Sequence, residues 1–105
     1  MVDIERIKPE IVERLKVLNP DKIILFGSYA RGEAREDSDI DLFLLMKEPK
    51  ENIEAKALFF LRDLMKKYQI GFDVLAEGKN FMAKRIDPFY NIAIMQQGKL
   101  LYGSK

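Results

Sequence analysis

Apolar positions recur along the chain with two different spacings, one typical of helices and the other of strands. Residues 3–18 and 51–68 carry an apolar side chain at every third or fourth position, which predicts two amphipathic helices. Three shorter runs, at 22–26, 39–46 and 70–76, have the length and apolar character of strands. The run at 39–46 is apolar on both faces after its first residues, so we expect this strand to be buried on both sides. In the second helix the expected inward stripe consists of Ile53, Ala57, Phe60, Leu61, Leu64 and Tyr68.

Proline, glycine and capping residues mark where several of these elements begin and end. An Asn-Pro pair closes the first helix, whereas Pro9 either splits that helix or marks its true start. Residues 87–98 begin with Asp-Pro and end with Gly, which is typical of a well-delimited helix. Residues 77–80 are expected to form a turn, and the pattern at 80–86 is ambiguous.

The order of the elements defines the fold class. Residues 28–32 add a single helical turn after the first strand, and residues 99–102 add a last short strand. The predicted order is therefore four successive pairs of a helix followed by a strand. The chain is too short for a doubly wound sheet. We predict an α+β (mixed α/β) fold, a small mixed sheet of about four strands with helices packed mainly on one face, in a single domain spanning 1–105.

Composition excludes several classes of chemistry. The 105 residues contain no cysteine and no histidine, which excludes thiolate chemistry, histidine-based triads and the usual zinc sites. A formal net charge of +1 and the lack of a basic stripe argue against a membrane or a nucleic acid as direct partner. The first residues show no signal-peptide pattern and no apolar run reaches membrane-spanning length, so we expect a cytoplasmic protein. Catalysis would have to use carboxylates, hydroxyls, Lys or Arg, or hard metal ions held by oxygen.

Two carboxylates stand at the beginning of the strand at 39–46, where burial alone would favour apolar residues. Because one residue separates Asp39 from Asp41, both side chains are expected on the same face, with Cα atoms about 6.6 Å apart. Like charges at that spacing need a cation between them, and Mg²⁺ suits an all-oxygen site that also takes phosphate oxygens. Asp73 interrupts the third strand and would join them if the two strands are neighbours, where it could accept a proton from an attacking hydroxyl. The ordinary alternative is a strand-start cap for the pair and an ion pair with a lysine for Asp73.

A Gly-Ser pair stands where the first strand ends and the helical turn begins. Because Gly27 has no side chain, a phosphate can approach the backbone there, and the Ser28 hydroxyl offers a hydrogen-bond donor. Taken alone, a Gly-Ser pair after a strand is usually just a turn. Together with the aspartates that follow, it supplies both phosphate donors and metal ligands, which a Mg²⁺–nucleotide requires.

The stretch "GSYARGEAREDSDID" places ten residues between Gly-Ser and Asp-x-Asp. This spacing resembles the signature of the DNA polymerase β-like nucleotidyltransferase superfamily. The small size and the inner "ARGEAREDSDIDL" resemble its minimal nucleotidyltransferase (MNT) branch, typically the antitoxins of HEPN–MNT toxin–antitoxin pairs. The resemblance extends from the first helix to the terminal "GKLLYG" and so covers most of the chain.

The resemblance implies a role for each matching residue. Gly27 and Ser28 would hold the nucleotide phosphates. Asp39 and Asp41 would bind two Mg²⁺ ions, and Asp73 would be the third carboxylate, on the catalytic metal. It further implies a protein adenylyltransferase, a type VII antitoxin that transfers AMP from ATP to a tyrosine of a partner HEPN toxin.

Several alternatives stay open from the sequence. The acceptor could be a small molecule or an RNA bound with a separate subunit, since about 30 residues follow Asp73 and leave little room for an acceptor pocket. The protein could also neutralise its partner by contact alone, although a pure binder has no reason to keep three charges in apolar strands. Arg31 or Arg35 could neutralise triphosphate charge, and Ser38 is expected to cap its turn. No pattern distinguishes ATP from other nucleoside triphosphates.

Overall fold

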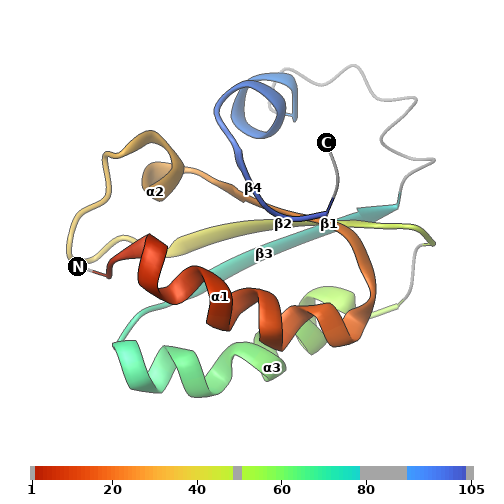
Figure 1. The fold of residues 1–105 in the computed structure, drawn as a ribbon, viewed down its shortest axis with the longest axis horizontal. Helices are drawn as coiled ribbons and strands as arrows, with labels where there is room; N and C mark the ends of the chain where they lie inside the picture. The colour runs from red at the N-terminus through yellow and green to blue at the C-terminus, as the bar shows by residue number, and fades with distance from the viewer. Residues whose placement is uncertain (1, 49–50, 79–89, 104–105) are drawn as a thin grey trace.

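The computed structural model describes residues 2–48, 51–78 and 90–103, and a four-stranded mixed sheet forms its centre (Figure 1). The strand order is β3-β2-β1-β4. Strand β1 runs antiparallel to both β2 and β4, whereas β2 and β3 run parallel. In chain order the elements are α1 (Ile4–Leu15), η1 (Lys16–Leu18), β1 (Pro20–Phe26), α2 (Ser28–Arg31), β2 (Ile40–Met46), α3 (Ile53–Tyr68), β3 (Phe72–Gly78), the π-helical η2 (Tyr90–Gln96) and β4 (Lys99–Tyr102).

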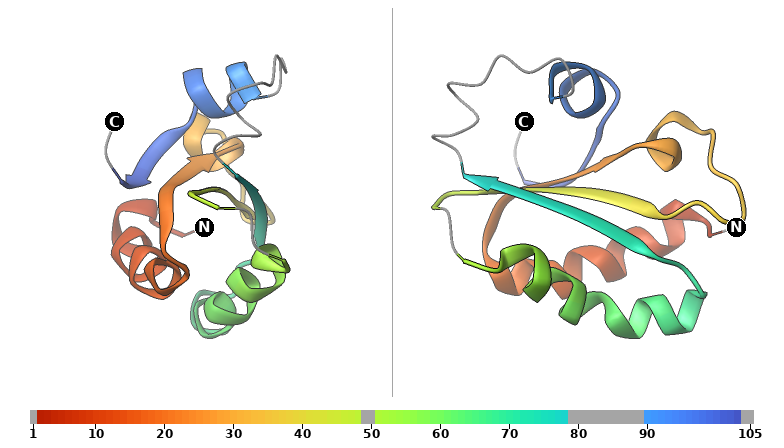
Figure 2. Two further views of the ribbon diagram at one scale, coloured as in Figure 1. Left: turned by 90° about the vertical axis from the view of Figure 1, so that its right-hand side faces the viewer. Right: turned by 180° about the vertical axis from the view of Figure 1, so that it is seen from behind.

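The two long helices lie on one face of the sheet, which confirms the predicted fold class. Figure 1 shows α1 and α3 side by side beneath the sheet, with η2 above it and α2 at one end; the views in Figure 2 agree. The main core fills the space between the sheet and the two helices. A smaller apolar cluster on the other face joins Ile94 of η2 to side chains of β1 and β2.

Strand β2 is buried on both faces, as its sequence predicts, because it is a central strand covered from both sides. Ile40, Leu42 and Leu44 belong to the main core. The alternate residues Phe43 and Leu45 belong to the smaller cluster under η2. Since side chains alternate along a strand, Asp41 lies on the same side as Phe43, away from the two long helices.

Helix α1 tolerates Pro9 in its interior, so Pro9 neither splits the helix nor starts it. The helix is capped by Asp3, whose Oδ1 accepts a hydrogen bond of 3.0 Å from the Glu5 backbone N–H. Proline removes one backbone hydrogen bond, to the carbonyl of Glu5, and both residues are exposed, so water can reach that carbonyl. Within the described parts of the chain, no helix has both the length and the apolar character needed to cross a membrane.

Two expectations for α3 and β3 were wrong in detail. Phe60 is 37% exposed and does not belong to the inward stripe of α3. Glu77 and Gly78 are not in a turn, because β3 continues through them as the parallel partner of Leu45 and Met46 of β2. In the last predicted helix, residues 90–96 are helical, whereas its proposed start at 87–88 and the ambiguous segment 80–86 lie outside the described residues.

Candidate active site

The register of the two parallel strands brings two of the predicted carboxylates together. Asp41 of β2 and Asp73 of β3 are direct partners across the ladder. Residues in register point to the same side of a sheet, so both carboxylates lie on the face that carries η2. Asp41 is half-buried and Asp73 is exposed. From the sequence, we expected Asp73 to join the other aspartates if its strand is a neighbour of theirs. Strands β2 and β3 are neighbours, so this condition is met.

Gly27 lies directly against the Asp41 carboxylate. A Cβ atom at Gly27 would come within 2.9 Å of Asp41 Cγ and would overlap Oδ2. Gly27 also has a φ of +75°, a conformation that favours glycine. The residue joins β1 to α2, and β1 pairs with β2 so that Phe26 is opposite Asp41. The Gly-Ser turn and the carboxylate pair thus meet at the same end of the sheet.

Asp39 precedes β2 and lies against a different glycine. A Cβ atom at Gly71 would come within 3.0 Å of Asp39 Cγ and would overlap Oδ1. The Ile40 backbone N–H donates to the Gly71 carbonyl at 2.9 Å, which begins the parallel ladder at this point. Asp39 itself is exposed. Sequence reasoning missed Gly71, although a glycine two residues before an intrastrand aspartate is a signal of close backbone approach.

The electrostatics of the site differ from those of an ordinary exposed carboxyl group. Burial raises the pKa of Asp41 from 3.8 to about 6, with further contributions from the charge of Asp73, a hydrogen bond with Asp73 and the charge of Asp39. Arg31 of α2 acts in the opposite direction and lowers the pKa of Asp41. A hydrogen bond between two carboxyl groups requires a shared proton, so the pair holds a proton more readily than a free aspartate does.

Hydrogen bonds and an ion pair between residues that are close in sequence order the segment between the Gly-Ser turn and the aspartates. The Arg31 guanidinium pairs with Glu33 at 3.4 Å, and the Glu33 backbone N–H donates to the Ser28 carbonyl at 2.9 Å. Ser38 caps its turn as predicted, because its Oγ accepts from the Arg35 backbone N–H at 2.8 Å. These contacts hold the ten intervening residues as a short folded connection between the two halves of the motif.

The donor set of this site fits a hard divalent cation in its chemistry. It consists of carboxylate oxygens that repel one another, and a nucleotide would supply phosphate oxygens as further ligands. In residues 2–48, 51–78 and 90–103, however, no group of three or more Asp, Glu, His or Cys side chains is placed to hold a metal ion by itself. Asp39 lies against Gly71 while Asp41 faces Asp73, so the assignment of all three as metal ligands stays a prediction.

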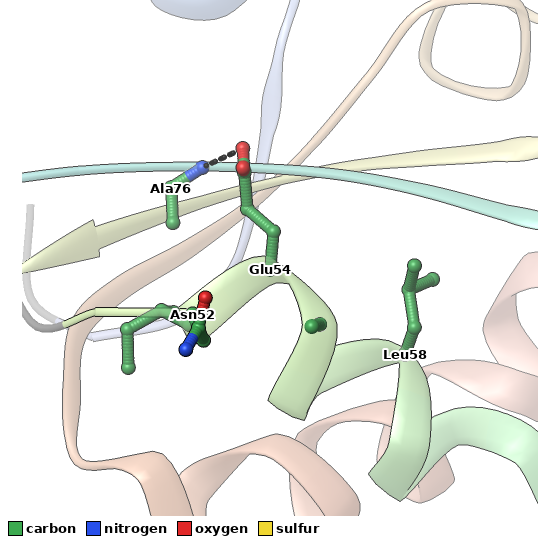
Figure 3. Close-up of a pocket in the computed structure, with 6 residues that line it drawn as sticks. Asn52, Glu54, Leu58 and Ala76 are labelled. Carbon is green, nitrogen blue, oxygen red and sulfur yellow. Dashed lines mark hydrogen bonds between the residues drawn. The ribbon is translucent and has the colours of Figure 1, made fainter.

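A pocket of about 430 Å³ lies elsewhere, where α3 begins beside the outer edge of β3 (Figure 3). Glu54 reaches across it, and its Oε2 accepts a hydrogen bond of 3.1 Å from the Ala76 backbone N–H. This contact satisfies one donor of an edge strand. The described residues that line the pocket include no nucleophile and no charge cluster, so we place the candidate active site at the carboxylates. Its lining residues are Asn52, Ile53, Glu54, Ala55, Leu58 and Ala76.

Comparison with known proteins identifies the class to which this fold and site belong. Residues 4–101 match the nucleotidyltransferase domain family, so nearly the whole chain takes part in the match. The chain belongs to this family and is an enzyme of the nucleotidyltransferase class. This confirms the family resemblance seen in the Gly-Ser to Asp-x-Asp stretch.

Relatives in Methanocaldococcus jannaschii carry a more specific name, "Putative protein adenylyltransferase". One is 31% identical over 81 residues, which cover 77% of each chain. A second is 38% identical over 86 residues, covering 76% of this chain and 56% of the relative. A third is 38% identical over 55 residues and covers 52% of each chain. The chain thus spans about three quarters of one relative and about half of the other two.

Solved structures share the fold at lower sequence identity. A chain of a toxin–antitoxin crystal structure with AMP-PNP has a TM-score of 0.64 and 24% identity, and the match covers 93% of this chain and 74% of that one. A chain from the tri-AMPylated Shewanella oneidensis HEPN toxin in complex with MNT antitoxin has a TM-score of 0.63 and 21% identity, with coverage of 97% and 74%. At this identity the likeness shows the fold.

Proposed function

We propose that this nucleotidyltransferase transfers AMP from ATP to a hydroxyl group of a partner protein, and that it acts as the antitoxin of a HEPN toxin in the cytoplasm. The observation that carries the proposal is the pairing of Asp41 with Asp73 beside Gly27 at one end of the sheet. The names of the M. jannaschii relatives support a protein acceptor. The toxin–antitoxin complexes among the structures of the same fold support a HEPN partner. The tyrosine acceptor within that partner follows from the family resemblance of the Gly-Ser to Asp-x-Asp stretch.

In the proposed reaction each matched residue has a defined role. Gly27 and Ser28 hold the triphosphate, and the absent side chain of Gly27 leaves room for the Asp41 carboxylate beside it. Asp39, Asp41 and Asp73 would hold two Mg²⁺ ions, which when bound neutralise charge on the phosphates and lower the pKa of the attacking hydroxyl. The acceptor oxygen bonds to the α-phosphorus, the bond to the bridging oxygen breaks, and pyrophosphate leaves. Asp73, the more exposed member of the pair, takes the proton of the hydroxyl.

The exposure of the site favours a macromolecular acceptor. Asp39 and Asp73 are exposed, and Asp41 is half-buried. A small acceptor would need walls to orient it, whereas a protein acceptor brings its own surface and covers the carboxylates when it binds. Covering them also strengthens the electrostatic interactions on which phosphoryl transfer relies.

The experiment that tests this proposal is label transfer. The protein is co-expressed with the product of the adjacent gene, which we expect to be a HEPN toxin, and the pair is incubated with Mg²⁺ and ATP labelled at the α-phosphate. We expect label on the partner with the wild-type protein and none with an Asp39→Asn, Asp41→Asn double variant. Mass spectrometry of the labelled partner then identifies the modified residue, which we expect to be a tyrosine.

The same experiment separates this function from inhibition by contact. If wild type and double variant both bind the partner and silence it, but neither transfers label, the adenylyl-transfer proposal is wrong. Label on a small molecule or on RNA in the reaction, with the partner unlabelled, would instead favour a different acceptor. ATP is compared with the other three nucleoside triphosphates in the same assay, and we expect ATP to be preferred.

A further inference from the structure

Leu75 of β3 is an exposed apolar side chain next to the carboxylate pair. It follows Asp73 by two residues on the same strand, so the two side chains lie on the same face with Cα atoms about 6.6 Å apart. Leu75 is 40% exposed, whereas its partner across the ladder, Phe43, is 3% exposed and Val74, on the opposite face of β3, is 8% exposed. Leu75 therefore exposes apolar surface on this face directly beside Asp73.

The other sides of Asp73 are occupied by groups that do not suit the carbon skeleton of an acceptor. Across the ladder lies Asp41, and beyond it the turn at Gly27 where the proposed function places the phosphates. Toward the start of β3 lie Gly71 and the Asp39 carboxylate that packs against it. Among the described neighbours of Asp73 on this face, Leu75 is the apolar side chain that an acceptor can contact while it presents its hydroxyl to Asp73.

We propose that Leu75 is the specificity-determining contact for the acceptor residue, packing against its carbon skeleton while the hydroxyl faces Asp73. This inference rests on the proposed function and sharpens it, because an apolar contact two residues from Asp73 favours an aromatic ring over a short aliphatic alcohol. The ring of a tyrosine separates its hydroxyl from its own backbone and would cover the exposed part of Leu75. A serine or threonine hydroxyl is too close to its backbone to make the same contact.

The test measures how the rate of transfer depends on each substrate separately. Initial rates of label transfer from ATP to the HEPN-class partner are measured for wild type, Leu75→Ala and Leu75→Met, varying the partner and ATP in turn. We expect Leu75→Ala to raise KM for the partner about tenfold, because the lost contact buries the exposed 40% of Leu75 together with the apolar surface that covers it. KM for ATP should stay unchanged, and Leu75→Met should retain near-normal values because methionine keeps a similar apolar volume.

A matched control separates this contact from a general loss of apolar surface. Val17 in η1, which continues α1 and lies outside the site, is 62% exposed, so Val17→Ala removes an exposed apolar group far from the chemistry. We expect Val17→Ala to behave as wild type. A rise in KM for ATP instead of the partner would assign Leu75 to the nucleotide base and overturn the inference, as would an unchanged KM for both. If the wild type labels no partner at all, the proposed function fails first and this inference fails with it.

Discussion

Charged side chains are arranged in opposite ways in two regions of this protein. Between α1 and α3, charges of opposite sign meet: Lys67 pairs with Glu10 at 2.7 Å, and Arg14 pairs with Asp63 at 2.9 Å. Hydrogen bonds from Lys67 and from Arg14 lower the pKa of the Glu10 and Asp63 carboxyl groups, respectively. These pairs join two helices and have no other evident task.

At the end of the sheet, charges of the same sign meet. Asp41 and Asp73 are partners in the ladder, Asp39 lies nearby, and the pKa of Asp41 is raised to about 6, chiefly by burial. The first arrangement favours the folded state slightly, whereas the second disfavours it whenever the carboxyl groups are ionised. A fold that keeps an unfavourable cluster beside a favourable set of pairs points to function as the reason for the cluster.

The largest effect on activity should come from neutralising a carboxylate of the acidic cluster (Asp39, Asp41 and Asp73). Neutralising a carboxylate in the ion pairs between α1 and α3 should have no such effect. We expect Asp73→Asn to reduce the rate of label transfer by roughly 10²–10⁴-fold, the range for loss of a general base. Asp63→Asn removes a charge of the same kind from the other region and should leave the rate unchanged. Rates of label transfer for the two variants, with circular dichroism to confirm folding, check this. Equal rates for Asp73→Asn and wild type would contradict the assigned role.

A second comparison uses two glycines with nearly the same φ but different ψ. Gly27 has φ +75° and ψ −155° and lies against Asp41, whereas Gly32 has φ +72° and ψ +24° and no atom within 4 Å of where its Cβ would be. Gly32→Ala should lower the free energy of unfolding by about 1 kcal/mol, the cost of a left-handed alanine. Gly27→Ala should lower it by roughly 2–4 kcal/mol and abolish transfer, because the Asp41 carboxylate must move. Urea unfolding of both variants measures the difference, and equal losses would show that Gly27 is not packed against Asp41.

The acidic cluster should also be visible in stability without any activity measurement. The pKa of Asp41 is about 6 in the folded protein and 3.8 ordinarily, so between these values the folded state binds more protons and its stability falls as pH rises. In metal-free buffer, Asp41→Asn should therefore raise the free energy of unfolding at pH 8 by on the order of 1 kcal/mol, after allowance for solvent screening. The gain should vanish about one pH unit below 3.8, where the wild-type group is protonated in both states. A gain of the same size at both pH values would exclude ionisation as its cause.

The smallest effect on stability is expected from removing one charge of the ion pairs between α1 and α3. Both Glu10 and Asp63 have lowered pKa values in the folded protein. Their contribution to the free energy of unfolding is therefore fully present at pH values above the ordinary carboxyl pKa, and it is lost as pH falls through the folded-state pKa. Asp63→Asn should lower Tm only slightly at neutral pH, because the pair is solvent-exposed, and the loss should shrink in high salt. Thermal unfolding at low and high salt measures this. A loss of stability as large as that of Gly27→Ala would mean that the Arg14–Asp63 pair stabilises the fold more than a solvent-exposed pair should.

Local patterns in the sequence were enough to predict most of the fold. The two amphipathic helices, the four strands and the carboxylates of the site can each be found from a few neighbouring residues. Pro9 shows the limit of such reasoning, because only the exposure of that part of α1 explains why the helix continues through it. Phe60 shows another, since its spacing fits the buried stripe but its side chain is 37% exposed.

Contacts between residues that are far apart in the sequence could not be predicted from such local patterns. The partnership of Asp41 with Asp73 depends on the register of two parallel strands, which the sequence does not specify locally. The contact of Gly71 with Asp39 and the exposure of Leu75 depend on the same register. The roles assigned to Gly27, Ser28 and the three aspartates therefore remain predictions to be tested, although the geometry now shows which of them meet.

The most direct test of this account is a titration of the Asp41 carboxyl group by NMR, first in metal-free buffer and then with Mg²⁺ and AMP-PNP. Without ligand, we predict that Asp41 titrates with a pKa of about 6, chiefly because of burial and the nearby Asp73. With Mg²⁺ and nucleotide bound, the pKa should fall below its ordinary value, because a cation between the carboxylates favours their ionised form. An ordinary pKa in the free protein, or a raised pKa that Mg²⁺ and nucleotide do not change, would contradict the claim that this cluster is the nucleotide site.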